Sequence, residues 1–227
     1  MADVHDGHRA RLRARFLQEG LDGFTEVQIL ELMLFYAVPR KDTNPIAHRL
    51  LDRFGSLADV LDAPAAELEK TEGVSSATAA LLHLFPAVAR QYEISRSAAV
   101  TVLDTTEKAG TWLLPRFAGE RDEVVYLLCL DARCRVLACR QLFRGGFSAA
   151  AISARKIVET ALSVNAAAVI LSHNHTSGIA LPSREDVDAT HALQKALQAV
   201  DIMLLDHIIV ADGDYVSMAD SGILRES

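Results

Sequence analysis

Residues 166–175 read Ala-Ala-Ala-Val-Ile-Leu-Ser-His-Asn-His, and this stretch decides the fold of the C-terminal half of the chain. Residues 166–171 are an unbroken apolar run of strand length, which predicts a buried central strand. His173 and His175 follow at positions i and i+2, so in extended backbone their side chains point to the same side. The sequence therefore predicts two imidazoles side by side at the end of a core strand.

A carboxylate follows at a spacing that suits a metal site. Ser177-Gly178 predicts a turn, and residues 182–186, Pro-Ser-Arg-Glu-Asp, predict a helix start. Asp186 would lie in the first turn of that helix and face the two histidines. Two imidazole nitrogens and one carboxylate oxygen suit zinc, and three protein ligands leave a fourth position for water, as in hydrolytic sites.

Each of these residues also has an ordinary structural interpretation. Ser183 followed by Asp186 matches a capping box, which stabilises a helix start without any further function. A single histidine after a core strand is usually a hydrogen-bonded core residue. The metal interpretation depends on the combination of His173, His175, the turn, Ser183 and Asp186.

At these residues the chain resembles the RadC branch of the MPN/JAB superfamily. His-x-His, seven residues, then Ser-x-x-Asp is the JAMM signature of its metallopeptidases. The resemblance implies an α/β fold, a cytidine-deaminase-like mixed sheet with helices, from about residue 101 onward. It also implies that His173, His175 and Asp186 bind zinc and that Ser183 orients or stabilises the tetrahedral oxyanion. The segments that carry the resemblance are residues 142–146, 165–175 and 200–210.

The sequence departs from this family where the general base is expected. JAMM enzymes use an upstream glutamate to accept a proton from the attacking water, and RadC-like sequences usually carry an acid before the Phe-Arg-Gly turn. Here that position is Arg140, and Lys156 replaces a second acid. Losing a general base costs on the order of 100- to 10,000-fold in rate. Glu159, the nearest acid in sequence, is the candidate substitute base. The alternative is that Glu159 is a solvated residue of the helix predicted over 151–162.

Composition indicates two ordinary globular domains. The 227 residues are 50% hydrophobic, enough to bury two cores. No apolar run reaches the roughly 18 residues of a membrane span, and the N-terminus lacks a signal peptide's apolar core, so we expect a cytoplasmic protein that does not bind membranes. An odd count of three cysteines argues against a disulfide framework, and we expect Cys129, Cys134 and Cys139 to be small buried or strand-edge residues.

The N-terminal region, residues 1–93, has helical periodicity throughout. Residues 64–70 and 76–92 are predicted helices on either side of Thr71-Glu72-Gly73-Val74-Ser75, which resembles a helix-hairpin-helix, the DNA-binding module that RadC-like proteins carry before the JAB domain. Gly73 and Ser75 would then bring backbone N–H groups to a DNA phosphate. Ser75 replaces the usual second glycine and is also a good helix cap, so a helical packing motif is the alternative.

Charge does not favour tight DNA binding. Residues 1–100 hold 11 Lys and Arg against 14 Asp and Glu. Phosphate contacts supply most of the affinity of nucleic-acid binders, so an acidic region predicts weak DNA binding at most. Arg9, Arg11, Arg13 and Arg15 alternate along the first helix, which spreads their charge around it and favours a solvated helix.

The sequence thus predicts an all-helical domain over 1–93, a linker over 94–100 and a JAB/MPN domain over 101–227. The leading function is a zinc metallopeptidase-type hydrolase that cleaves a peptide or isopeptide substrate. The alternative is a catalytically weakened, zinc-stabilised interaction module associated with DNA or with repair and recombination proteins. The oligomeric state does not follow from the sequence.

Overall fold

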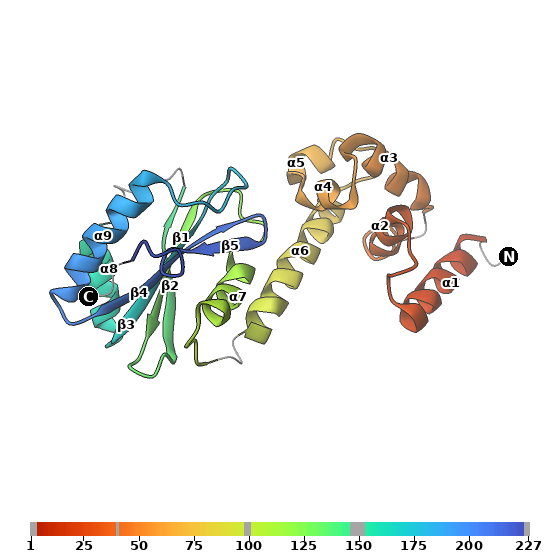
Figure 1. The fold of residues 1–227 in the computed structure, drawn as a ribbon. Helices are drawn as coiled ribbons and strands as arrows, with labels where there is room; N and C mark the ends of the chain where they lie inside the picture. Colours follow the sequence, from red (N-terminus) through yellow and green to blue (C-terminus); the bar gives the residue numbers. More distant parts are fainter. Residues whose placement is uncertain (1–3, 40, 98–100, 146–152, 225–227) are drawn as a thin grey trace. The chain divides into compact units, whose positions relative to one another are not determined.

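The computed structural model of this chain describes residues 4–39, 41–97, 101–145 and 153–224. The chain divides into two compact units, residues 1–89 and 90–227 (Figure 1). Among the described residues, no helix combines the length and the apolar character that a membrane span requires.

The first unit is helical, as the periodicity predicts. Thr25 begins the second helix through a capping box with Gln28, and Ser56 caps the fourth, while Gly55 ends the third helix with a φ of 102° that favours glycine. Leucines from several of the helices, among them Leu30 and Leu82, fill one core. The helices are α1 (Val4–Glu19), α2 (Glu26–Leu34), α3 (Asn44–Phe54), α4 (Leu57–Asp62), α5 (Ala65–Leu68) and α6 (Ser76–Ser97).

Helix α6 differs from the prediction at its C-terminal end. We expected a linker over residues 94–100, but α6 continues through Ser97, and the boundary between the two units falls inside this helix, after Ala89. Small and polar residues do not end a helix when local pairs support it. Arg96 contacts both Glu93, at 3.4 Å, and the ring of Tyr92, in the preceding turn. Residues 98–100 lie outside the described residues.

The second unit is a five-stranded mixed sheet with strand order β2-β1-β3-β4-β5. Strand β3 pairs with β4 in parallel, while the other neighbours are antiparallel. All seven residues of β3 are buried, which confirms the predicted central strand. The strands are β1 (Val124–Leu130), β2 (Val136–Arg144), β3 (Ala168–Asn174), β4 (Met203–Ala211) and β5 (Asp214–Ser217).

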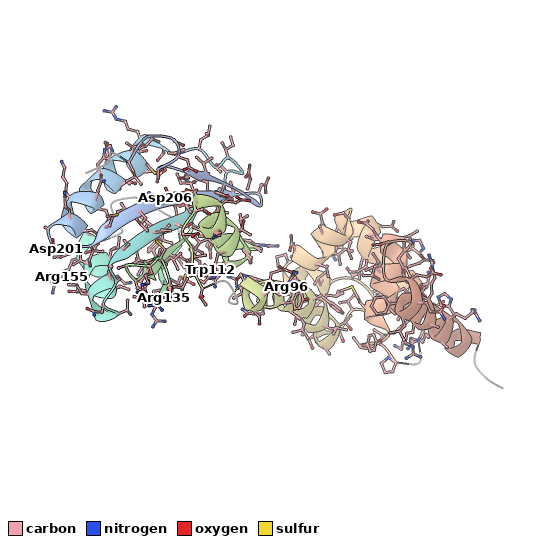
Figure 2. The ribbon with its side chains drawn as sticks, turned by 60° about the horizontal axis from the view of Figure 1, so that its bottom comes forward. Arg96, Trp112, Arg135, Arg155, Asp201 and Asp206 are labelled. Carbon is pink, nitrogen blue, oxygen red and sulfur yellow. The ribbon has the colours of Figure 1, made fainter. Side chains whose placement is uncertain are left out.

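Helices cover both faces of this sheet (Figure 1). Helices α8 (Ala154–Ser163) and α9 (Arg184–Gln198) pack on one face against a core that includes Leu127, Leu171 and Leu204. Helix α7 (Thr106–Phe117) packs on the other face, where it buries Trp112, labelled in Figure 2. The mixed sheet with flanking helices and the helical region before it confirm the predicted α/β fold. Helix α9 connects the parallel strands β3 and β4, so its N-terminus lies after the C-terminal end of β3.

Candidate metal centre

His173 and His175 lie at the C-terminal end of β3. The strand runs to Asn174, three residues beyond the predicted apolar run, so His173 is part of the sheet and its side chain is fully buried. The backbone N–H of His175 donates to Val210 of β4 at 2.8 Å, which keeps the chain extended one residue further. Both side chains therefore point the same way, and their Nε2 atoms are 3.0 Å apart.

Asp186 reaches this pair from the first turn of α9. Ser183 is the N-cap: its hydroxyl accepts from the Asp186 N–H at 3.1 Å and donates to Asp186 Oδ2 at 2.6 Å, and the Ser183 N–H donates to the same oxygen at 2.8 Å. This capping box holds the Asp186 carboxylate, whose Oδ1 is 3.3 Å from His173 Nε2 and whose Oδ2 is 3.3 Å from His175 Nε2. The structure thus brings together the three residues that the sequence singled out, as a group that could hold a metal ion.

The hydrogen-bonding roles of these three groups leave acceptors at their meeting point. His175 Nδ1 lies 3.1 Å from the carbonyl oxygen of Ile179, which can only accept, so Nδ1 carries a proton, and in the neutral tautomer Nε2 holds the lone pair. Burial lowers the pKa of His173 to about 4, against the opposing effect of Asp186, and this ring is therefore neutral at pH 7. Burial also disfavours the Asp186 carboxylate, but the Ser183 hydrogen bond and the two imidazoles outweigh it and keep the pKa of Asp186 below its usual value.

The distances between these ligand atoms fit a cation with tetrahedral coordination. Atoms that bind one zinc ion at about 2.0–2.1 Å in tetrahedral geometry stand roughly 3.3 Å from each other. The distance between the two Nε2 atoms is 3.0 Å, and each of them is 3.3 Å from one oxygen of Asp186. Two imidazole nitrogens and a carboxylate at this spacing suit a shared proton or a cation between them, so the donor set fits a metal ion.

Comparisons with known proteins agree with this geometry. Residues 103–223 match the family described as the RadC-like JAB domain. The chain is 39% identical over 214 residues to the UPF0758 protein Mpe_A2695 of Methylibium petroleiphilum, a match that covers 94% of this chain and 96% of that protein. The chain belongs to the RadC family. Its RadC-like JAB domain carries the His-His-Asp group at the C-terminal end of β3.

Two buried residues of this RadC-like domain that the sequence did not single out stand behind His173. His173 Nδ1 is 2.8 Å from His207 Nε2 on β4, and His207 Nδ1 is 2.6 Å from the hydroxyl of Thr190 on α9. Burial, together with the neighbouring His173, lowers the pKa of His207 to about 3. The sequence did contain a signal for these contacts, because Asp206 and His207 interrupt an otherwise apolar strand. Which residues they contact, however, depends on the order of the strands in the sheet.

Glu123 is a second feature that the sequence analysis missed. The side chain of Asn174, between the two histidines, accepts from the Val124 N–H at 2.7 Å and donates to the Asp122 carbonyl at 3.0 Å. These two bonds fix the backbone on both sides of Glu123. Val125 lies opposite His173 in the antiparallel β1–β3 pair, and continuing this register by two residues beyond the paired strands directs Glu123 to the His173 face, toward the level of His175. An acid directly before a predicted strand was the available signal.

The structure also shows where Arg140 and Glu159, the two residues in the sequence hypotheses about the general base, lie. Arg140 lies opposite Leu127, which lies opposite Leu171, so Arg140 is two strands and two residues from His173, roughly 12 Å at ordinary strand spacings. Glu159 is 60% exposed and pairs at 2.7 Å with Arg155, itself 85% exposed on the outer side of α8 (Figure 2). These positions agree with the alternative that Glu159 is a solvated helix residue. Lys156 donates to the Leu142 carbonyl at 2.8 Å and joins α8 to β2.

Gly73 and Ser75, the residues proposed for DNA, have structural roles between α5 and α6. Gly73 has a φ of 91°, and a Cβ there would stand 2.9 Å from side-chain carbons of Ile46. Ser75 caps α6 by accepting from the Thr78 N–H at 3.2 Å. The helix-hairpin-helix assignment and its contact with DNA stay predictions.

Proposed function

We propose that this RadC family member is a zinc-dependent hydrolase of the metallopeptidase type that cleaves an amide or isopeptide bond. The observation that carries the proposal is the convergence of His173 Nε2, His175 Nε2 and the Asp186 carboxylate at separations of 3.0–3.3 Å. Zinc with three protein ligands supplies Lewis-acid polarisation of a carbonyl and activates water as a nucleophile near neutral pH.

Ser183 would act on this site through Asp186. Its backbone and hydroxyl both donate to Oδ2, so the carboxylate is oriented before any ion binds. The resemblance to JAMM peptidases implied that Ser183 orients or stabilises the oxyanion. The capping box supports an orienting role, since the hydroxyl proton is already directed at Asp186.

Glu123 is our candidate for the group that accepts a proton from the attacking water. Two observations support this proposal: Asn174 holds the backbone on both sides of Glu123, and the β1–β3 register, continued beyond Val125, directs Glu123 toward the face of the two histidines. A carboxylate on a rigid strand end suits general-base catalysis, which depends on positioning. This proposal replaces both Arg140 as the altered base position and Glu159 as the substitute base.

The test combines metal content with hydrolysis by the full-length protein. We expect about one zinc per chain, loss of most of it in His173→Ala, His175→Ala and Asp186→Ala, and cleavage of at least one substrate in a panel of fluorogenic peptides and isopeptides. Removing one of three ligands leaves too few to hold the ion tightly. A wild-type protein that takes up no more zinc than a variant with all three of these alanine substitutions would refute the metal site.

Two further variants separate the base from the fold. Glu123→Gln should keep its zinc and lose roughly 100- to 10,000-fold in rate, as expected for loss of a general base. Arg140→Glu serves as the control on the same sheet and should leave the rate unchanged. Full zinc loading with no hydrolysis of any substrate would instead favour the zinc-stabilised interaction module.

A further inference from the structure

A chain of three hydrogen bonds begins behind the candidate metal centre. His173 Nδ1 contacts His207 Nε2 at 2.8 Å, His207 Nδ1 contacts Thr190 Oγ1 at 2.6 Å, and Thr190 Oγ1 donates to the Asp186 carbonyl at 2.6 Å. The exposed fractions of His173, His207 and Thr190 are 0%, 2% and 0%. The chain of bonds thus links β3, β4 and α9 in the core, and it begins and ends on residues of the candidate metal centre.

The direction of these bonds follows from the metal position. A neutral imidazole that gives its Nε2 lone pair to a cation carries its proton on Nδ1. His173 Nδ1 then donates, so His207 must accept at Nε2 and carry its own proton on Nδ1. Thr190 must accept that proton's hydrogen bond, and its hydroxyl hydrogen is directed at the Asp186 carbonyl, which can only accept. Every donor in the chain meets an acceptor.

The neighbouring acid does not take this role. Asp206, labelled in Figure 2, accepts from the Ser217 hydroxyl at 2.6 Å, from the Ala219 N–H at 3.0 Å and from the His207 N–H at 2.7 Å. Strand alternation directs its side chain to the opposite face of β4 from His207. The second nitrogen of His173 therefore meets a neutral ring, whereas a carboxylate is a common partner of metal-binding histidines.

We propose that His207 and Thr190 are positioning residues that hold His173 in the tautomer with its lone pair on Nε2, and thereby set the affinity of the site for a divalent metal cation. This inference rests on the metal-binding part of the proposed function and is independent of hydrolysis. Loss of such an outer partner typically costs roughly 10- to 100-fold in metal affinity.

The first test measures zinc affinity by competition with a chelator, using the full-length protein. His207→Leu and Thr190→Val should each weaken zinc binding roughly 10- to 100-fold. His207→Gln keeps an acceptor for His173 Nδ1, and Thr190→Ser keeps the hydroxyl, so both should bind zinc close to the wild-type affinity. His191→Leu is the control: it is adjacent to Thr190 on α9, but its ring bonds to the Ile223 carbonyl at 3.0 Å. We expect no change in its zinc affinity.

A second readout separates positioning from simple loss of stability. Nitrogen-15 NMR of the histidine rings in the zinc-loaded protein should show His173 protonated on Nδ1 and His207 protonated on Nδ1. The melting temperature of each metal-free variant gives the cost to the fold, and the increment on adding zinc gives the cost to metal binding. Thr190→Val and His207→Leu should reduce that increment, while Thr190→Ser and His207→Gln should restore it.

Four outcomes would overturn the inference, and the last of them would also remove the proposed function. His207 protonated on Nε2 in the zinc-loaded protein, or variants that melt earlier yet keep the full zinc increment, would make His207 and Thr190 ordinary core residues. Equal zinc affinity of wild type and His207→Leu would do the same while leaving the metal site intact. A wild type that binds no zinc would remove both this inference and the proposed function.

Discussion

Asp186→Asn tests the convergence of acceptors most directly, because it exchanges a carboxylate oxygen for an amide N–H₂ at nearly constant shape. The amide oxygen can still accept from the Ser183 N–H, the bond that spans 2.8 Å in the wild type. The N–H₂ group would then take the place of Oδ1, which lies 3.3 Å from His173 Nε2, while the amide oxygen keeps the place of Oδ2, which lies 3.3 Å from His175 Nε2. The substitution therefore supplies a donor to His173 Nε2 and removes the negative charge that a cation needs.

The expected effect of Asp186→Asn on the free energy of unfolding differs between the metal-free and the zinc-loaded protein. In the metal-free protein, one new hydrogen bond contributes roughly 0.5–1.5 kcal/mol, and loss of the charge at the start of α9 costs about 0.3–1 kcal/mol. The free energy of unfolding should therefore stay within about 1 kcal/mol of wild type. Asp186→Ala lacks this donor and the capping-box acceptor for Ser183, and should lose about 1–3 kcal/mol.

Added zinc should make wild type more stable than Asp186→Asn. At a free zinc concentration of about 100 times Kd, wild type gains about 2.7 kcal/mol, which raises the melting temperature of a unit of this size by roughly 10 °C. Asp186→Asn should show little of this gain, while the control Asp188→Asn, exposed on the same helix, should show all of it.

The assay uses the single tryptophan of the chain. Trp112 lies in α7 of the second unit, so its fluorescence reports the unfolding of the unit that holds the site. A zinc increment for Asp186→Asn equal to that of wild type would refute the role of Asp186 as a ligand. A metal-free Asp186→Asn protein as unstable as Asp186→Ala would refute the assignment of a lone pair to His173 Nε2.

Three further predictions concern other parts of the chain. Gly110→Ala should destabilise the second unit by roughly 1–3 kcal/mol in thermal melts, because a Cβ there overlaps the ring of Tyr215; a stabilised variant would contradict this packing. Burial raises the pKa of the Cys129 and Cys139 thiols to about 11, so at pH 8 iodoacetamide should modify Cys134 before these two. The two slow thiols should react about tenfold faster per pH unit up to about pH 11, and labelling of all three cysteines at one rate would argue against this prediction. Duplex DNA should bind the full-length chain no tighter than about 10⁻⁶ M at physiological salt, with affinity falling steeply as salt rises, and a nanomolar Kd in a binding titration would contradict this.

The DNA prediction gains support from the arginines of α1. Arg9 donates to the Val38 and Lys41 carbonyls, and its guanidinium lies 4.9 Å from the centre of the Phe35 ring. Arg15 pairs with Glu19 and donates to the Gly23 carbonyl. Half of the alternating arginines are therefore used within the first unit, and their charge is less available to phosphate than the sequence suggests.

Features of the site that depend on local sequence were predictable. The apolar run identified β3, the i, i+2 spacing put His173 and His175 on one face, and the Ser183–Asp186 capping box identified the start of α9. In each case the signal lies within a few residues, where backbone geometry determines side-chain direction.

Features that depend on strand pairing were not predictable. His207 contacts His173 because β4 is the parallel neighbour of β3, and Glu123 is directed toward the level of His175 because β1 is the antiparallel neighbour of β3. The distance of Arg140 from His173, which counts against Arg140 as the base position, is likewise set by the register across two strand pairs. That register includes an irregularity between Val125 and Tyr126, which no periodic pattern in the sequence reveals.

Asn174 shows how one tripeptide can organise both halves of such a site. Its neighbours on either side present their rings to Asp186, while its own amide bonds to backbone groups of the segment before β1. A short polar side chain with both a donor and an acceptor is needed there, because it meets a carbonyl and an N–H two residues apart. An aspartate would place a second acceptor against the Asp122 carbonyl, and an alanine would leave that buried edge without partners. The residue between the two histidines therefore ties these candidate metal ligands to the segment that carries Glu123, so the position of the proposed base follows from the same tripeptide, residues 173–175, that supplies two of the three candidate ligands.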